Sequence, residues 1–321
     1  MNRRQFLHTG SLMGFGACLL PRLRSEGEAA NPDKSRVVLA ATSVDLRKPD
    51  LKALGSALDR GLEALTGRPA GQGWASLFSP HDVVGLKVNC LAGRGISTNP
   101  FLVELVVDRL LTTGISPGHI IIWDRLNADL KRGGFAIATT PGQVRCFGND
   151  VAGYSRQLYE SGPVCSRLSN LVTTTCTALI NLPVLKDHGI VGLSAGMKNW
   201  FGAIDNPNKY HDHCGDPYVA EISRLPHLRD KTRLTICDAI TAQYEGGPPY
   251  MPQWCWPFQR LILATDMVAL DSVSWQFVEE KRRQKGMASL REAGREPSYI
   301  RTAERLGLGI ADPLRIEIVE V

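Results

Sequence analysis

The chain has 321 residues, of which 43% are hydrophobic and 21% are charged, and these are the proportions of an ordinary globular protein. Its formal net charge is +5, but no basic stripe is present that could follow a nucleic-acid backbone, so binding to nucleic acid is not expected. The densest basic run, Lys281 to Lys285, follows two glutamates at an expected helix end and is typical of a solvated face.

The first thirty residues have the layout of a twin-arginine export signal. Arg3 and Arg4 precede an aromatic and an aliphatic residue, and a weakly apolar run then continues to Leu20. This run is shorter than the roughly 20 residues that a membrane-spanning helix needs, so no permanent membrane span is expected. We expect residues 1–30 to be a signal peptide read by the twin-arginine export machinery, residues 31–35 to be a linker, and the protein to be periplasmic or extracellular.

Two alternatives to this interpretation remain open. A chance Arg-Arg pair could stand at the start of a cytosolic protein, although charge, apolar run and small residues follow one another here in the order of a signal. A lipoprotein signal could end at Cys18, which follows Ala17, although Phe15 and Gly16 fit such a site poorly.

Beyond residue 35, short β-branched runs alternate with helical patterns. The predicted strands are 36–42, 83–89, 119–124, 178–184, 233–238 and 260–265. The predicted helices are 50–65, 99–113, 193–204, 217–228 and 266–281. Several of the strands are continuously apolar, as buried parallel strands are. The alternation predicts an α/β fold with a mainly parallel sheet and helices on both faces.

Residues 36–321 are expected to form a single α/β domain. The stretch 133–176 is rich in Gly, Ser, Thr and Arg and interrupts the alternation of strands and helices. We interpret it as a candidate irregular insertion.

Polar residues end several of the predicted strands. Lys87 and Asn89 end one strand, Asp238 ends another, and Lys186 and His188 follow a third. Since ligands of open α/β sheets bind outside the carboxyl ends of the strands, these residues are expected to share one cleft. A lysine in an apolar strand must be paired or have a shifted pKa, so Lys87 and Lys186 are candidate anion-binding charges or bases. Asp124 also ends a strand, where capping of the next turn is an equal alternative.

The segment from Pro183 to Trp200 runs from a strand through a glycine-rich loop into a predicted helix. Backbone donors at that helix start, with Lys198 and Asn199 nearby, would suit a carboxylate or a phosphate. His188 is a candidate proton carrier, and the alternative is a histidine that is only hydrogen-bonded.

A loop at residues 210–216 gathers imidazole, carboxylate and thiol groups. His211, His213 and Cys214 are candidate ligands of a metal ion, and the alternative is a solvated polar loop. The eight cysteines include no C-x-x-C pair, which disfavours an internally encoded iron–sulfur cluster.

Glu245 lies in a turn with two glycines and two prolines, which would hold its carboxylate in place. We expect it to meet a cation, either Lys87 or Lys186, or a bound metal, or to take a proton from a substrate. A solvated turn carboxylate is the alternative.

The chain resembles a bacterial and archaeal family known as domain of unknown function 362. The resemblance runs from about Val83 to Gln276 and lies in Gly85 to Asn89, Thr98 to Pro100, Asn181 through Lys186 and His188 to Asn199, His211, Asp216 to Tyr218, Asp238, Glu245 to Pro248, and Thr265 to Asp271. It implies an α/β protein. Some members carry fused ferredoxin-type cluster domains, whose cysteine spacing this chain lacks.

Together these patterns predict an exported enzyme that acts on a small anionic metabolite by proton transfer. The expected catalytic residues are Lys87, Lys186, His188, Asp238 and Glu245, and the expected substrate-binding residues are Asn89, Thr98, Lys198 and Asn199. The alternatives are a non-catalytic binding protein for an anionic solute, and a metal or redox protein that is loaded before export.

Overall fold

The computed structural model describes residues 34–43 and 50–321, so the predicted signal peptide, Cys18 and most of the predicted linker lie outside the described residues. In the described part, ten strands form one sheet. Its main path runs through β12 (Ile316–Glu320), β1 (Ser35–Ala41), β11 (Cys255–Ala264), β10 (Thr232–Gln243), β7 (Ala178–Leu182), β2 (Val84–Val88), β3 (Ile120–Trp123) and β4 (Arg145–Cys146). β8 (Val184–His188) pairs with β10 and with β9 (Gly192–Ser194).

The sheet is mainly parallel, as the sequence predicts. β11 runs antiparallel to both of its neighbours, and β9 runs antiparallel to β8. The other pairs of neighbouring strands are parallel. The carboxyl ends of β2, β3, β7 and β8 therefore lie toward one edge of the sheet, where a ligand cleft is expected.

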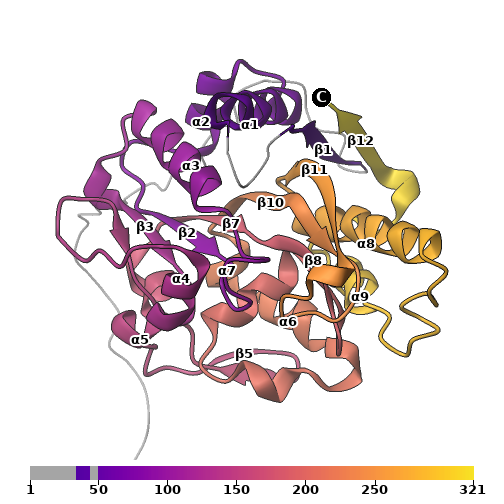
Figure 1. The fold of residues 1–321 in the computed structure, drawn as a ribbon. Coiled ribbons are helices and arrows are strands. Elements are labelled where there is room, and N and C mark those ends of the chain that lie inside the picture. Colours follow the sequence, from indigo (N-terminus) through magenta and orange to yellow (C-terminus); the bar gives the residue numbers. More distant parts are fainter. Residues whose placement is uncertain (1–33, 44–49) are drawn as a thin grey trace, which may run out of the picture.

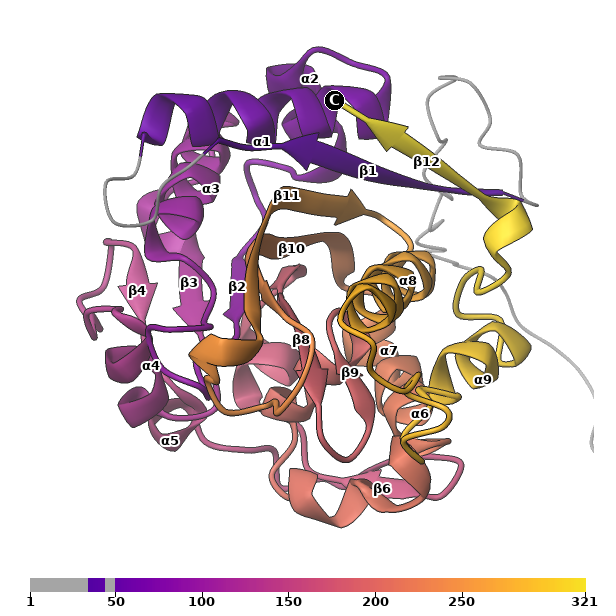
Figure 2. The same cartoon turned by 45° about the vertical axis from the view of Figure 1, so that its right-hand side comes forward.

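Helices cover both faces of the sheet (Figures 1 and 2). One core includes buried residues of α1 (Leu51–Thr66), α2 (Ala70–Leu77), α3 (Pro100–Thr112) and α4 (Asn127–Gly133). The other core includes buried residues of α6 (Tyr218–Arg224), α7 (Pro226–Arg229), α8 (Met267–Gln284) and α9 (Tyr299–Arg305). The short turns of helix are η1 (Pro117–His119), η4 (Pro207–Tyr210), η5 (Asp212–Gly215), η6 (Pro252–Trp254) and η7 (Pro313–Arg315).

Alternation along the strands explains why the sequence shows continuous apolar runs. In β1, Val37 and Leu39 belong to one core, whereas Val38 and Ala40 belong to the other. Successive side chains of a strand point to opposite faces of the sheet, so a sheet that is covered on both faces needs an apolar residue at every position.

Two predicted helices differ from the structure. Residues 193–204 do not form an α-helix, because β9 ends at Ser194 and a 3-10 helix, η3 (Met197–Ala203), follows. The prediction of one helix over 217–228 is also wrong, since the chain is extended at Leu225 and α7 restarts at Pro226. The residue before a proline avoids the helical region, which explains this break.

Residues 133–176 make an excursion from the main pattern. It contributes β4 to the sheet, then α5 (Asn149–Ala152), and then β5 (Tyr159–Ser161) and β6 (Val164–Ser166), which form a separate two-stranded sheet. A π-helical turn, η2 (Leu171–Thr175), leads into β7. That this stretch is an inserted unit stays a prediction.

No helix in the described ranges is long and apolar enough to cross a membrane. The seven cysteines of these ranges are all free thiols.

Candidate functional site

A cleft of about 410 Å³ opens at the carboxyl ends of the parallel strands. Its walls come from the residues that follow β2 and β3, from β8 and β9, from η3 and η4, and from the loop after β10. The candidate residues that line it are Lys87, Asn89, Lys186, His188, Lys198, Asn199 and His211. Segments that are far apart in the sequence meet here because parallel strands share an edge of the sheet.

The side chain of Lys87 is held in place in the cleft by three hydrogen bonds. Its buried Nζ donates to Val88 O at 2.6 Å, to Asp124 Oδ1 at 2.8 Å and to Asn199 Oδ1 at 3.2 Å. Gly202 provides the space, because a Cβ at that position would lie 2.6 Å from Lys87 Cε. All three hydrogens of the ammonium group are used, so Lys87 is arranged to be a fixed charge.

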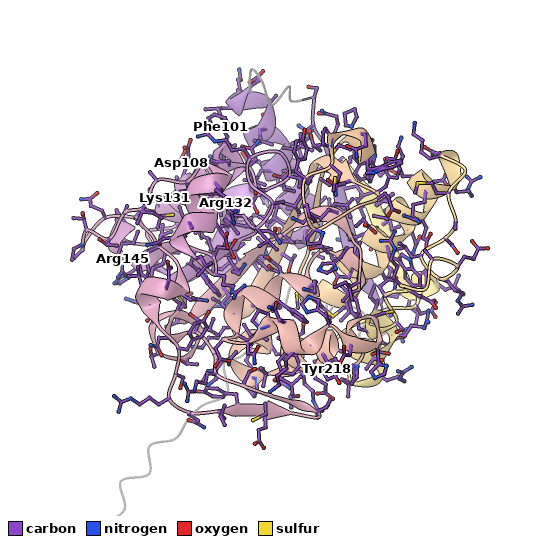
Figure 3. The ribbon with its side chains drawn as sticks, turned by 60° about the horizontal axis from the view of Figure 1, so that its bottom comes forward. Phe101, Asp108, Lys131, Arg132, Arg145 and Tyr218 are labelled. Carbon is purple, nitrogen blue, oxygen red and sulfur yellow. The ribbon has the colours of Figure 1, made fainter. Side chains whose placement is uncertain are left out.

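From the sequence, Asp124 could be either a residue of the site or a cap of the next turn. In the structure it is the counter-ion of Lys87. Its second oxygen accepts from Cys90 N at 2.7 Å, and Oδ1 also accepts from Arg125 N at 2.8 Å. Asp129, which also lines the cleft, is paired with Arg132 on α4, labelled in Figure 3. Both carboxylates of the cleft therefore already have a cationic partner.

Lys186 is buried and has no carboxylate partner among residues 34–43 and 50–321. Its Nζ donates to Asn89 Oδ1 at 2.9 Å and to Ile96 O at 3.3 Å. Burial lowers the pKa of Lys186 to about 8, against the opposing influence of Asp124. Asn89 in turn donates to Asn199 Oδ1 at 3.1 Å, so the two asparagines join Lys186 to Lys87.

Lys198 faces an aromatic ring. Its Nζ lies 3.6 Å from the centroid of Phe201, and no described residue offers it a carboxylate or a hydrogen-bond acceptor. Burial, and then repulsion by Lys186 and Lys87, lowers the pKa of Lys198 to about 7. Both its ammonium and its amine form are therefore present near neutral pH.

His188 is a neutral donor at the wall of the cleft. Its Nδ1 accepts from Ile190 N at 3.3 Å and from Val191 N at 3.4 Å, which leaves the proton of the neutral ring on Nε2. Burial, and then repulsion by Lys198 and His211, lowers the pKa of His188 to about 2. The ring stacks on His211 at 5.5 Å between centroids, and His211 meets Phe201 edge-on at 5.2 Å.

The prediction that Asp238 and Thr98 belong to this cleft is wrong. Both line a second cavity, of about 450 Å³, beside the start of α3. Asp238 accepts from the backbone N–H of Asn99 at 2.8 Å, and burial raises its pKa to about 6. β10 does not end at Asp238 but continues to Gln243, so this residue lies within the strand and away from its carboxyl end. Thr98 donates to Leu182 O and accepts from Asn89 N, so it positions Asn89.

Glu245 meets a cation, but the predicted lysine partners are wrong. It pairs with Arg282 of α8 and, at 2.6 Å, with Arg295. Burial opposes its charged form, but the hydrogen bond from Arg282 and the charge of Arg295 together hold the pKa of Glu245 below its usual value. Arg295 also pairs with the buried Asp187, the residue before His188. Glu245 therefore lies behind the cleft wall and does not line the cleft itself.

The three predicted metal ligands are not brought together. Cys214 Sγ donates to Gly294 O at 3.2 Å, and His211 Nδ1 lies 3.3 Å from Asn208 O. Among the residues that the structure describes, no group of three His, Cys, Asp or Glu side chains could hold a metal ion. A metal centre built from His211, His213 and Cys214 has no support in this geometry.

The predicted anion site at a helix start is occupied from within the protein. The N–H groups of Gly196 and Met197 donate to the carboxylate of Asp271 on α8, at 2.6 Å and 2.9 Å. Burial raises the pKa of Asp271 to about 7, although these two hydrogen bonds favour its charged form. The backbone at this position is thus not available to a ligand.

Several cleft residues were missed at the level of sequence. Phe201 lies three residues after Lys198, within the segment that the sequence predicts to be an α-helix, and it was not singled out there. Leu91 and Ile190 stand singly in loops, where an apolar residue gives no periodic signal.

Two comparisons with known proteins bear on this site. Residues 84–276 match the model of a protein family whose description is domain of unknown function, DUF362. This span includes every residue of the cleft, from Lys87 to Pro248. No curated protein matches the chain.

Proposed function

Because the chain belongs to the family described as domain of unknown function 362, we propose a function from the chemistry of the cleft: an enzyme that holds a small organic anion and transfers a proton. The observation that carries the proposal is the pair of buried lysines, Lys186 and Lys198, which line one cleft and have no carboxylate partner in the described ranges. An unpaired buried charge is costly, and a bound anion would compensate it.

The groups divide into holding and reacting roles. Lys186 is the more basic of the two lysines and holds the anionic group as an ammonium. Lys198, with a pKa of about 7, is the base, because a base works best when its pKa is near the working pH. Lys87, whose charge is balanced by Asp124, holds the amide of Asn199 in place. The amides of Asn89 and Asn199 are used in orienting the lysines.

The proposed step removes a proton from a carbon next to a carbonyl group. The Lys198 amine takes the proton and becomes an ammonium. The electron pair of the C–H bond forms a C=C bond to the carbonyl carbon, and the π pair of the carbonyl group moves onto its oxygen. The Nε2–H of His188 stabilises that oxygen by a hydrogen bond, and the imidazole itself stays neutral throughout. Return of the proton to carbon completes an exchange or an isomerisation.

We further propose that residues 1–30 direct export by the twin-arginine route, on the strength of Arg3, Arg4 and the apolar run that follows them. A protein that folds before export would reach the periplasm with this cleft already formed.

The test of the enzymatic proposal uses 2-oxobutanoate, a small carboxylate with exchangeable protons beside its carbonyl group. We expect the protein to accelerate exchange of the C3 protons in D₂O, measured by NMR, and Lys198→Met to reduce the acceleration about a hundredfold or more. Lys285→Met, which removes an exposed lysine at the end of α8, is the matched control. Binding without exchange would favour a non-catalytic binding protein, and the absence of both would overturn the proposal.

A further inference from the structure

The more exposed lining of the cleft includes apolar residues beside the polar Asn208 and Arg125, whereas its lysines are buried. Leu91 and Ile190 both line it, and their side chains are 51% and 54% exposed. They come from the loop after β2 and from the turn between β8 and β9, and Pro207 and Pro248 line the same cleft. Single exposed apolar residues are common, but Leu91 and Ile190 come from two separate segments and line the same cleft, and the half-buried Pro248 and the buried Pro207 add to its apolar lining.

The two lysines and His188 are less accessible than Leu91 and Ile190. Lys186, Lys198 and His188 are all buried. Phe201 is also buried, lines the cleft and lies against Lys198. A molecule that fills the cleft would therefore meet charge at one end and apolar side chains along the other.

The size of the cleft excludes a bare inorganic ion as a complete occupant. A volume of about 410 Å³ is within the range of roughly 300–1,000 Å³ that is typical of sites for organic ligands. Part of its lining, formed by Leu91, Ile190, Pro207 and Pro248, offers no hydrogen-bonding side chain.

We propose that the ligand of this cleft is an amphipathic organic anion, with an anionic head group held by Lys186 and an apolar body against Leu91 and Ile190. This inference rests on the proposed function of the same cleft. It adds a requirement that the proposed function does not make, namely that affinity grows with the apolar length of the ligand.

The test measures the dissociation constants of acetate, butanoate, hexanoate and octanoate by calorimetry. Affinity is expected to rise with chain length, by up to about fourfold for each methylene group that leaves water. Leu91→Ser and Ile190→Ser should flatten this rise and leave butanoate affinity almost unchanged. Leu158→Ser is the matched control, because Leu158 is 53% exposed and lies outside the cleft.

Two failures of this test are distinguishable. If the short carboxylates bind and Lys186→Met weakens them, but chain length has no effect, the amphipathic ligand is refuted while the proposed anion site stands. If none of the carboxylates binds, or if Lys186→Met changes none of the affinities, the proposed function fails as well. Parallel titrations of phosphate and octyl phosphate show which head group is preferred, and octyl phosphate must bind more tightly than phosphate if the inference holds.

Discussion

Lys198 Nζ lies 3.6 Å from the centroid of the Phe201 ring. The two carboxylates that line the same cleft, Asp124 and Asp129, are each paired with another cation. A cation over an aromatic face is stabilised, but less than it would be by a carboxylate or by water. Part of the free-energy cost of burying the Lys198 ammonium is therefore not compensated. The predictions about pH and about ligands follow from this.

The first prediction concerns the effect of pH on activity. Since Lys198 must be a neutral amine to accept a proton, exchange of 2-oxobutanoate protons should rise as pH increases through about 7. Loss of the Lys186 proton near pH 8 should lower the rate again, because Lys186 holds the substrate as an ammonium. His188, whose pKa is about 2, should add no step between pH 5 and 9. Rates measured over that range check this, and a rate that falls as pH rises through 7 would exclude Lys198 as the base.

The second prediction concerns stability in Lys198→Met. The pKa of Lys198 is lowered in the folded protein, so between about 7 and 10.5 the unfolded chain binds the proton that the folded chain does not. The destabilisation by Lys198 is therefore fully present below pH 7 and fades as pH rises toward 10.5. We expect the variant to be more stable than the parent at pH 6, by on the order of 1–3 kcal/mol, and the difference to shrink at pH 9.5. Thermal unfolding at the two pH values measures it, and a difference that grows with pH would contradict the assignment.

The third prediction concerns the space that Gly202 leaves for Lys87. In Gly202→Ala, the added Cβ would lie 2.6 Å from Lys87 Cε and 2.8 Å from Nζ. The end of Lys87 cannot move cheaply, because it is held by three acceptors. We expect a loss of about 1–3 kcal/mol in the free energy of unfolding, together with a loss of anion binding.

The control for this variant is Gly71→Ala. Gly71 lies in α2, and a Cβ there would meet no atom within 4 Å. This substitution should be neutral or stabilise the protein by up to about 1 kcal/mol. Equal effects of the two substitutions in chemical denaturation would show that the space around Lys87 is not critical.

The fourth prediction concerns Glu245→Gln. The substitution keeps the shape of the side chain but leaves Arg282 and Arg295 without its charge. We expect a loss of stability of about 1–2 kcal/mol near pH 7. The loss should disappear in acid, because a carboxylate with a lowered pKa stabilises the folded state only while it is ionised.

Measuring anion affinity distinguishes a structural role of Glu245 from a role in ligand binding. Since it lies behind the cleft wall, butanoate affinity in Glu245→Gln should change less than threefold, whereas Lys186→Met should lose it. A variant that keeps its stability but loses affinity would show that Glu245 takes part in ligand binding.

The fifth prediction concerns export. Replacing Arg3 and Arg4 by lysine keeps the charge but removes the arginine pair that the receptor reads, so the protein should stay in the cytoplasm. Replacing Arg22 and Arg24 by lysine is the matched control and should leave export intact. Cell fractionation and immunodetection measure the outcome, and normal export of the first variant would refute the twin-arginine assignment.

The α/β fold and the place of the cleft followed from local patterns. Continuous apolar runs such as Ile120 to Trp123 indicate a sheet covered on both faces, because alternate side chains enter opposite cores. Lys87 and Lys186 stand at or near the ends of such runs, and parallel strands bring their carboxyl ends to one edge. These two properties depend on the order of residues within single strands.

Partner choice and strand length were decided by the tertiary structure. Asp238 looks like a strand end, but pairing with β11 extends β10 to Gln243 and turns Asp238 toward the start of α3. Glu245 meets Arg282 and Arg295, which are 37 and 50 residues away, and not the lysines of the cleft. Charge attracts any nearby opposite charge, so only the packing of α8 and the following loop against the sheet decides which cation is near.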